Sequence, residues 1–80
     1  MPSLFLTDEQ VEASPPIVAY KIMSMIETKA DERVSIFDIT YGFRKEKWFS
    51  YNNIVLGLIF LYTAGLIDFD EPYVVKDVAN

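Results

Sequence analysis

The pattern of hydrophobic and polar positions predicts three helices followed by two short strands. The longest apolar stretch covers residues 51–64, where the polar side chains other than tyrosine are two asparagines and one threonine. Ser50 precedes this stretch as a favourable N-cap, and Gly65 follows it where a left-handed residue commonly ends a helix. The pattern therefore predicts a helix of about four turns over residues 51–64.

This helix is apolar on all sides. Leu56 and Phe60 lie on the far side, and Gly57 leaves room for the close approach of another backbone. The main face consists of Ile54, Leu58, Leu61 and Tyr62, continued by Val55, Ile59 and Leu66. A helix that is apolar all round must be buried on nearly all sides, yet a domain this small buries only about 60–65% of its unfolded surface. We therefore expect a second molecule to cover the side that this chain cannot cover.

An amphipathic helix is expected upstream, over residues 17–29. Pro15 and Pro16 are typical of a first helical turn, and the apolar residues that follow recur at helical spacing. Residues 1–14 are expected to form an N-terminal arm, in which residues 3–6 are a candidate anchor that a partner would order.

The segment between residues 34 and 47 leaves two interpretations open. Its beginning, residues 34–37, fits a short strand, but Ser35 also fits the cap of a helix over residues 36–43. Gly42 weakens that helix by about 1 kcal/mol relative to alanine. The helix is favoured by a small margin because three apolar residues would share one of its faces: Ile36, Ile39 and Phe43.

The C-terminal part predicts a short hairpin. Residues 66–70 alternate apolar with polar side chains, Glu71 and Pro72 supply a turn, and residues 73–76 fit a returning strand. Residues 77–80 are expected to form a tail.

The expected order is helix, helix, turn, helix and hairpin. These are the parts of a winged helix-turn-helix, so the predicted fold class is mostly α with a small β-hairpin, an α+β fold. Eighty residues make a single domain, which we place at residues 15–76 between the arm and the tail.

Charge and composition narrow the classes of function. The formal net charge of −5 argues against binding to nucleic acid or to anionic membranes, because both reward clusters of lysine and arginine. No lysine or arginine occurs from Trp48 through Val75, where a DNA-reading helix and wing would need them. Lys45 and Lys47, just upstream, are the candidate phosphate contacts. We expect protein partners, no membrane, no direct nucleic-acid binding, and a cytoplasmic location, because no leader, spanning segment or cysteine is recognisable.

Catalytic chemistry is not expected. The chain has no histidine and no cysteine, which removes the commonest general base, the commonest metal ligand and all thiolates. Asp68, Asp70 and Glu71 form a tight group of carboxylates at the predicted turn, where a solvated surface is a simpler interpretation than a Mg²⁺ or acid–base site. The sequence therefore predicts a protein that is not an enzyme and holds no cofactor or metal.

Part of the chain resembles a known family. Residues 54–68 (IVLGLIFLYTAGLID) and residues 71–74 (EPYV) are similar to the closing motif of the small middle-component proteins of ABC-three-component systems. Residues 17–26 (IVAYKIMSMI) resemble the first helix of the same family. These systems are bacterial anti-phage operons, best known from Lamassu-type defence, that encode an SMC-like ATPase, an effector and a small winged-helix protein. The similarity extends in pattern over residues 16–75 and leaves residues 1–14 unmatched.

The resemblance implies a non-enzymatic adaptor that bridges an SMC-like ATPase and an effector in a hetero-oligomeric complex. We expect docking through the apolar third helix and the wing. The candidate partner-binding residues are Tyr51, Leu56 and Phe60 on the helix, Trp48 and Phe49 before it, and Phe69 and Tyr73 on the wing. The alternative is a small regulator, either an acidic phage-type inhibitor or a winged-helix repressor that binds DNA.

Overall fold

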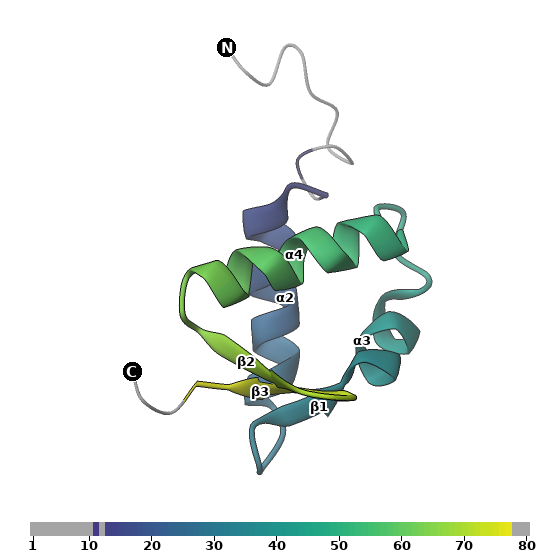
Figure 1. The fold of residues 1–80 in the computed structure, drawn as a ribbon. Helices are drawn as coiled ribbons and strands as arrows, with labels where there is room; N and C mark the ends of the chain where they lie inside the picture. The colour runs from purple at the N-terminus through teal and green to yellow at the C-terminus, as the bar shows by residue number, and fades with distance from the viewer. Residues whose placement is uncertain (1–10, 12, 78–80) are drawn as a thin grey trace.

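The computed structural model describes residue 11 and residues 13–77 of the chain. In these residues the elements follow the order α2 (Pro15–Glu27), β1 (Arg33–Ser35), α3 (Ile36–Phe43), α4 (Tyr51–Thr63), β2 (Ile67–Asp70) and β3 (Tyr73–Lys76) (Figure 1). This is the mostly α, α+β fold with a winged-helix-like layout that the hydrophobic pattern predicted. The candidate anchor at residues 3–6 and the end of the tail, residues 78–80, lie outside the described residues.

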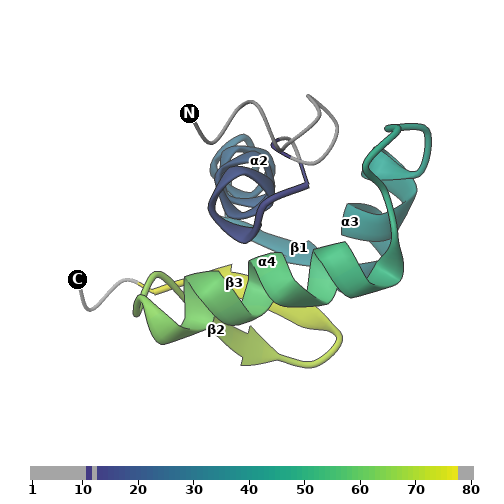
Figure 2. The same ribbon diagram turned by 90° about the horizontal axis from the view of Figure 1, so that it is seen from above.

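The core forms where α4 crosses α2, and the sheet and α3 pack against the same core (Figures 1 and 2). α2 begins at Pro15, as its prolines indicate, and ends at Glu27 rather than at Lys29. Gly57 lies at the crossing, because a Cβ placed there would be 2.8 Å from Cγ1 of Val18. The close approach at Gly57 is confirmed, but the approaching group is a side chain of α2. The buried residues of the two helices are Val18, Ala19, Ile22 and Ile26 of α2 and Ile54, Gly57, Leu58 and Leu61 of α4.

The two interpretations of residues 34–47 are both realised, one after the other. β1 ends at Ser35, and α3 begins at the next residue. The Ser35 hydroxyl accepts a hydrogen bond from the backbone N–H of Asp38 at 3.0 Å, which is the N-cap that favoured the helix. Ile39 is the buried residue of α3, and Phe43 packs against the core.

The wing is a three-stranded sheet and not the two-stranded hairpin that the sequence pattern predicted. The antiparallel strands lie in the order β1, β3, β2, and Val34 of β1 stands opposite Val74 of β3. On the other side of β3, Phe69 stands opposite Val74, and Asp70 opposite Tyr73. Opposite residues share a face and neighbours alternate, so Val34, Phe69 and Val74 lie on the inner face. Asp70 and Tyr73 lie on the outer face.

Both ends of α4 are closed as the sequence predicts. At its start, the Ser50 hydroxyl accepts a hydrogen bond from the backbone N–H of Asn53 at 3.0 Å. After its end, Gly65 has a φ of 75°, a left-handed conformation that glycine adopts without strain. The Leu66 N–H donates to the Leu61 carbonyl at 3.0 Å, the hydrogen bond that defines a Schellman motif. α4 therefore ends at Thr63, one residue earlier than expected, and Gly65 ends it in the left-handed conformation that the sequence predicted.

Candidate functional site

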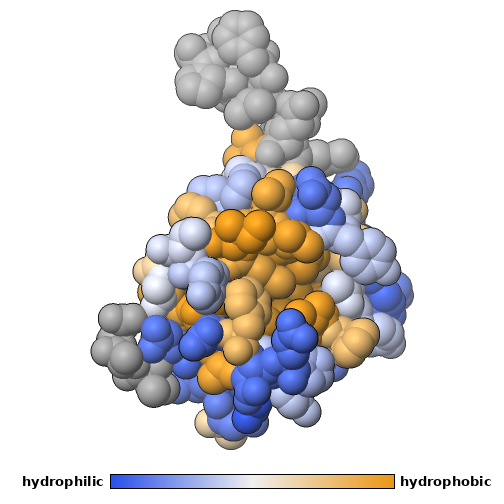
Figure 3. Space-filling model, viewed as in Figure 1, coloured by the Kyte–Doolittle hydropathy of each residue, from blue (hydrophilic) through white to orange (hydrophobic). Residues whose placement is uncertain are grey.

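Five large hydrophobic side chains of α4 point away from the core. We call this surface the α4 face: Val55, Leu56, Ile59, Phe60 and Tyr62. Between 40 and 53% of each of these residues is exposed. Figure 3 shows a hydrophobic patch over α4, with hydrophilic residues around it. Contiguous apolar patches that are rimmed by polar residues mark interaction sites on protein surfaces. The α4 face is therefore the candidate functional site.

The α4 face exists because α2 covers only a narrow stripe of α4. The two helices cross rather than run side by side (Figures 1 and 2), and only four residues of α4 are buried. The structure divides the expected main face of the helix. Ile54, Leu58 and Leu61 are buried, whereas the other residues assigned to that face or to its continuation are exposed: Val55, Ile59, Tyr62 and Leu66.

The α4 face continues onto the wing through two stacked rings. The ring centroids of Tyr62 and Phe69 lie 5.4 Å apart with an interplanar angle of 29°. Such a pair contributes about 0.5–1.5 kcal/mol beyond the burial of its area. Leu66, in the connection between α4 and β2, is also exposed. The stacked pair therefore joins the end of α4 to the edge strand of the wing, and the two form one surface.

The wing that borders this surface is acidic, although Asp68 and Asp70 alternate with Phe69 and lie on the outer face of the sheet with Tyr73. Asp68, Asp70 and Glu71 are all exposed. Arg33 of β1 donates a hydrogen bond to Asp70 at 3.0 Å, and its guanidinium carbon lies 4.3 Å from the ring centroid of Tyr73. Residues 48–75 contain no lysine or arginine, so β2 supplies carboxylates, neither α4 nor β2 supplies a cation, and the cation that pairs with Asp70 is Arg33 of β1.

Lys76, at the end of β3, is held by carboxylates at the end of α2 and in the residues before β1. Its ammonium nitrogen lies 3.1 Å from a carboxylate oxygen of Glu27 and 3.2 Å from one of Glu32. Hydrogen bonds to Glu27 and then Glu32 raise the pKa of Lys76 above its ordinary value. These pairs are exposed and stabilise the fold only slightly, but they keep this cation away from the α4 face.

The structure brings together three of the seven predicted partner-binding residues. Leu56 and Phe60 lie on the α4 face, and Phe69 lies beside it. Trp48 is only 4% exposed and belongs to the core, which corrects its assignment as a docking residue. Tyr73 is exposed on the outer face of the sheet, the opposite face from Phe69, so it is not part of this surface.

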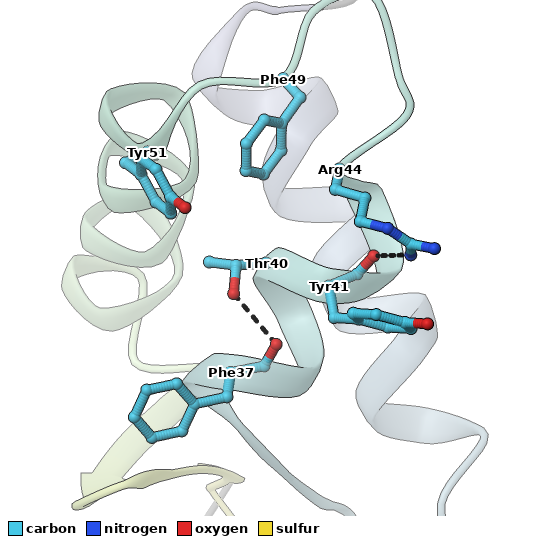
Figure 4. A pocket seen from close by; sticks show the side chains of 6 residues that line it. All are labelled: Phe37, Thr40, Tyr41, Arg44, Phe49 and Tyr51. Carbon is cyan, nitrogen blue, oxygen red and sulfur yellow. Dashed lines mark hydrogen bonds between the residues drawn. The ribbon is translucent and has the colours of Figure 1, made fainter.

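The other two predicted residues, Phe49 and Tyr51, line a separate pocket of about 270 Å³ between α3 and the start of α4 (Figure 4). Sequence reasoning missed the α3 side of this pocket. Its residues follow the spacing of one helical stripe, which places two aromatic rings on the side of α3 opposite Ile39. Aromatic residues on the exposed side of a predicted helix were the feature of the sequence that could have indicated this pocket. The residues are Phe37, Thr40, Tyr41 and Arg44.

The candidate phosphate contacts lie beside this pocket. Lys45 and Lys47 occupy the turn that joins α3 to α4, and both are exposed. Neither forms an ion pair with another residue in the described part of the chain. They are therefore free to meet an acidic group from outside.

Among residue 11 and residues 13–77, no group of three acidic side chains is arranged to hold a metal ion. No helix there combines the length and the apolar character that crossing a membrane requires.

Comparison of the chain with protein-family models, with curated proteins and with solved structures finds no match. The similarity of residues 54–68 to the middle-component proteins stays a prediction from the sequence. The function is therefore argued from the surfaces themselves.

Proposed function

We propose that the chain is a non-enzymatic adaptor that binds a protein partner through the α4 face and the adjoining wing. The observation that supports the proposal is the exposure of five large hydrophobic side chains on one side of a helix whose other side is packed. Covering side chains that are already half-buried yields about 1 kcal/mol each, or about 5 kcal/mol together. Association itself costs about 4–15 kcal/mol. A stable complex therefore needs contacts from the wing as well as the α4 face.

The charge around the α4 face favours a different protein over a second copy. Two copies would bring the carboxylates of Asp68, Asp70 and Glu71 towards an equally acidic molecule of net charge −5. Like charges at an interface disfavour association, whereas complementary charges steer it. The partner that fits best presents an apolar segment flanked by lysine or arginine.

The resemblance of residues 54–68 to the middle-component proteins supports a more specific assignment. In this assignment the partners are an SMC-like ATPase and its effector, and the chain bridges them in a bacterial anti-phage complex in the cytoplasm. The chain then works as a structural subunit of a hetero-oligomer.

Co-purification with the products of the neighbouring genes tests this proposal. Leu56→Asp and Phe60→Asp each place a carboxylate in the centre of the α4 face, where burial without a partner charge is strongly unfavourable. Each variant should fold normally and lose the complex. Tyr20→Asp is the matched control, because Tyr20 is an exposed aromatic residue on α2, away from the α4 face. Tyr20→Asp should retain the complex.

If both α4 variants bind the ATPase and the effector as the wild type does, the α4 face is not the interface. The second candidate function, a DNA-binding regulator, is favoured by Lys45 and Lys47, which are exposed and form no ion pair within residues 13–77. It predicts binding to duplex DNA that weakens steeply with salt and weakens further in Lys45→Ala and Lys47→Ala.

A further inference from the structure

The pocket between α3 and α4 is lined mainly by aromatic rings (Figure 4). Phe37 and Tyr41 come from α3, and Phe49 and Tyr51 come from the start of α4 and the residues before it. Thr40 lies between the two sides. The volume of about 270 Å³ is slightly below the range of small-molecule sites, about 300–1,000 Å³. The pocket therefore has room for a side chain or two of a peptide.

Two of these rings are not required by the core. Phe37 is 72% exposed and Tyr51 is 71% exposed, so neither fills space inside the molecule. Phe49 and Tyr51 meet edge to face with centroids 5.4 Å apart, which fixes the orientation of that wall. Exposed aromatic rings in a fixed arrangement are typical of binding surfaces, where they supply contact area at a low cost in conformational entropy.

The edge of the pocket is positively charged. The guanidinium carbon of Arg44 lies 3.7 Å from the ring centroid of Tyr41, and Nη1 donates a hydrogen bond to the Tyr41 carbonyl at 2.6 Å. A guanidinium has five N–H groups, so others stay available for a carboxylate. Lys45 and Lys47 follow in the same turn. Arg33 and Lys76, in contrast, are neutralised by acidic partners elsewhere in the fold.

We propose that this pocket binds a short acidic segment of a partner protein. One large apolar side chain of the segment enters between the rings of Phe37, Phe49 and Tyr51, and flanking carboxylates pair with Arg44 and the lysines of the turn. The proposal does not depend on the α4 face, which has an acidic rim and fits a basic partner. The two surfaces therefore select partners of opposite charge.

A single strand of nucleic acid also stacks on aromatic rings, but the surroundings of the pocket favour a peptide. Proteins that bind single strands follow the backbone with a positively charged groove over about 4–16 nucleotides. Here the cations of the turn are interrupted by Glu46, and residues 51–75, which include α4 and β2, contain no lysine or arginine. A phosphate backbone would leave the positive area after a few nucleotides.

Selection from a library of random dodecapeptides, followed by titration of the selected peptide, tests this proposal. We expect selected sequences in which a large apolar residue is flanked by aspartate or glutamate. Arg44→Glu and Tyr51→Ala should each weaken the affinity for the selected peptide at least tenfold. The matched controls should not change it: Lys29→Glu reverses a charge in a different turn, and Tyr20→Ala removes a tyrosine that is as exposed as Tyr51.

Two results would overturn the proposal. One is a library that yields no acidic consensus, or a consensus peptide that binds Arg44→Glu and Tyr51→Ala as tightly as the wild type. The other is binding of oligo(dT) that is lost in Arg44→Glu while no peptide is selected, which would assign the pocket to nucleic acid. Leu56→Asp should keep full affinity for the selected peptide, so failure of this proposal and failure of the adaptor proposal are distinguishable.

Discussion

At the scale of single residues, the two glycines inside helices have opposite predicted responses to an added methyl group. At Gly57 a Cβ would lie 2.8 Å from Cγ1 of Val18, a fully buried residue whose β-branched side chain has one favoured rotamer in a helix. At Gly42 a Cβ would lie 2.5 Å from Cε of Met25, the free end of a flexible side chain. We expect Gly57→Ala to lower the free energy of unfolding by about 1–3 kcal/mol, because the core is overpacked. Gly42→Ala should raise it by up to about 1 kcal/mol, because alanine favours a helix.

Urea denaturation followed by the fluorescence of Trp48, the one tryptophan in the chain, measures both changes. The control for the mechanism is a double variant. Val18→Ala makes room for the new methyl group, so Gly57→Ala should cost less in that background than in the wild type. A Gly57→Ala variant as stable as the wild type would show that α4 does not pack on α2 as closely as the structure indicates.

At the scale of elements, local signals predicted the helices well because caps are encoded by adjacent residues. Ser35 and Ser50 each accept the expected N-cap hydrogen bond, and Gly65 ends α4 in the expected conformation. β1 was not predicted as a strand of the sheet because its pairing is non-local. Its residues bond to β3 about 40 residues later, and three residues are too few to show alternation.

The candidate site was predictable only in part, because the sequence of α4 is apolar on every side. Periodicity cannot choose the inward side of such a helix, and the choice is made by the crossing with α2. Gly57 was the one local sign of that crossing. Leu56 and Phe60 were placed correctly on the outward side, whereas Trp48 follows a charged turn and looked exposed. Its burial depends on packing between elements that are distant in the sequence.

The two sides of α4 lead to a prediction with a matched pair of leucines. Leu58 is 6% exposed and Leu56 is 40% exposed, and both are near the middle of the helix. Leu58→Ala should lower the free energy of unfolding by about 2–5 kcal/mol, because it leaves a cavity beside α2. Leu56→Ala should change it by less than about 1 kcal/mol, because Leu56 is exposed and its truncation leaves no cavity in the core. Urea midpoints of the isolated chain measure both, and equal effects would contradict the assigned sides.

At the scale of the whole molecule, charge is distributed so that the two proposed binding surfaces differ in sign. The α4 face and wing combine apolar side chains with Asp68, Asp70 and Glu71, while the α3–α4 pocket combines aromatic rings with Arg44 and Lys45. A bridge between two different proteins benefits from such a difference, because each partner is repelled by the wrong surface. The net charge alone, −5, does not reveal this arrangement.

Salt should have opposite effects on two associations that cover the α4 face: self-association of the chain and its complex with a basic partner. When the chain is alone, copies that associate through that face bury it against an equally acidic molecule. Raising the salt concentration screens this repulsion and should increase the mass measured by light scattering after size exclusion. A complex with a partner that has a basic rim should instead weaken as salt rises, because screening removes the attraction. Leu56→Asp should abolish both associations. If salt strengthens the complex with the partner as well, the acidic wing takes no part in recognition, and the α4 face binds through its apolar side chains alone.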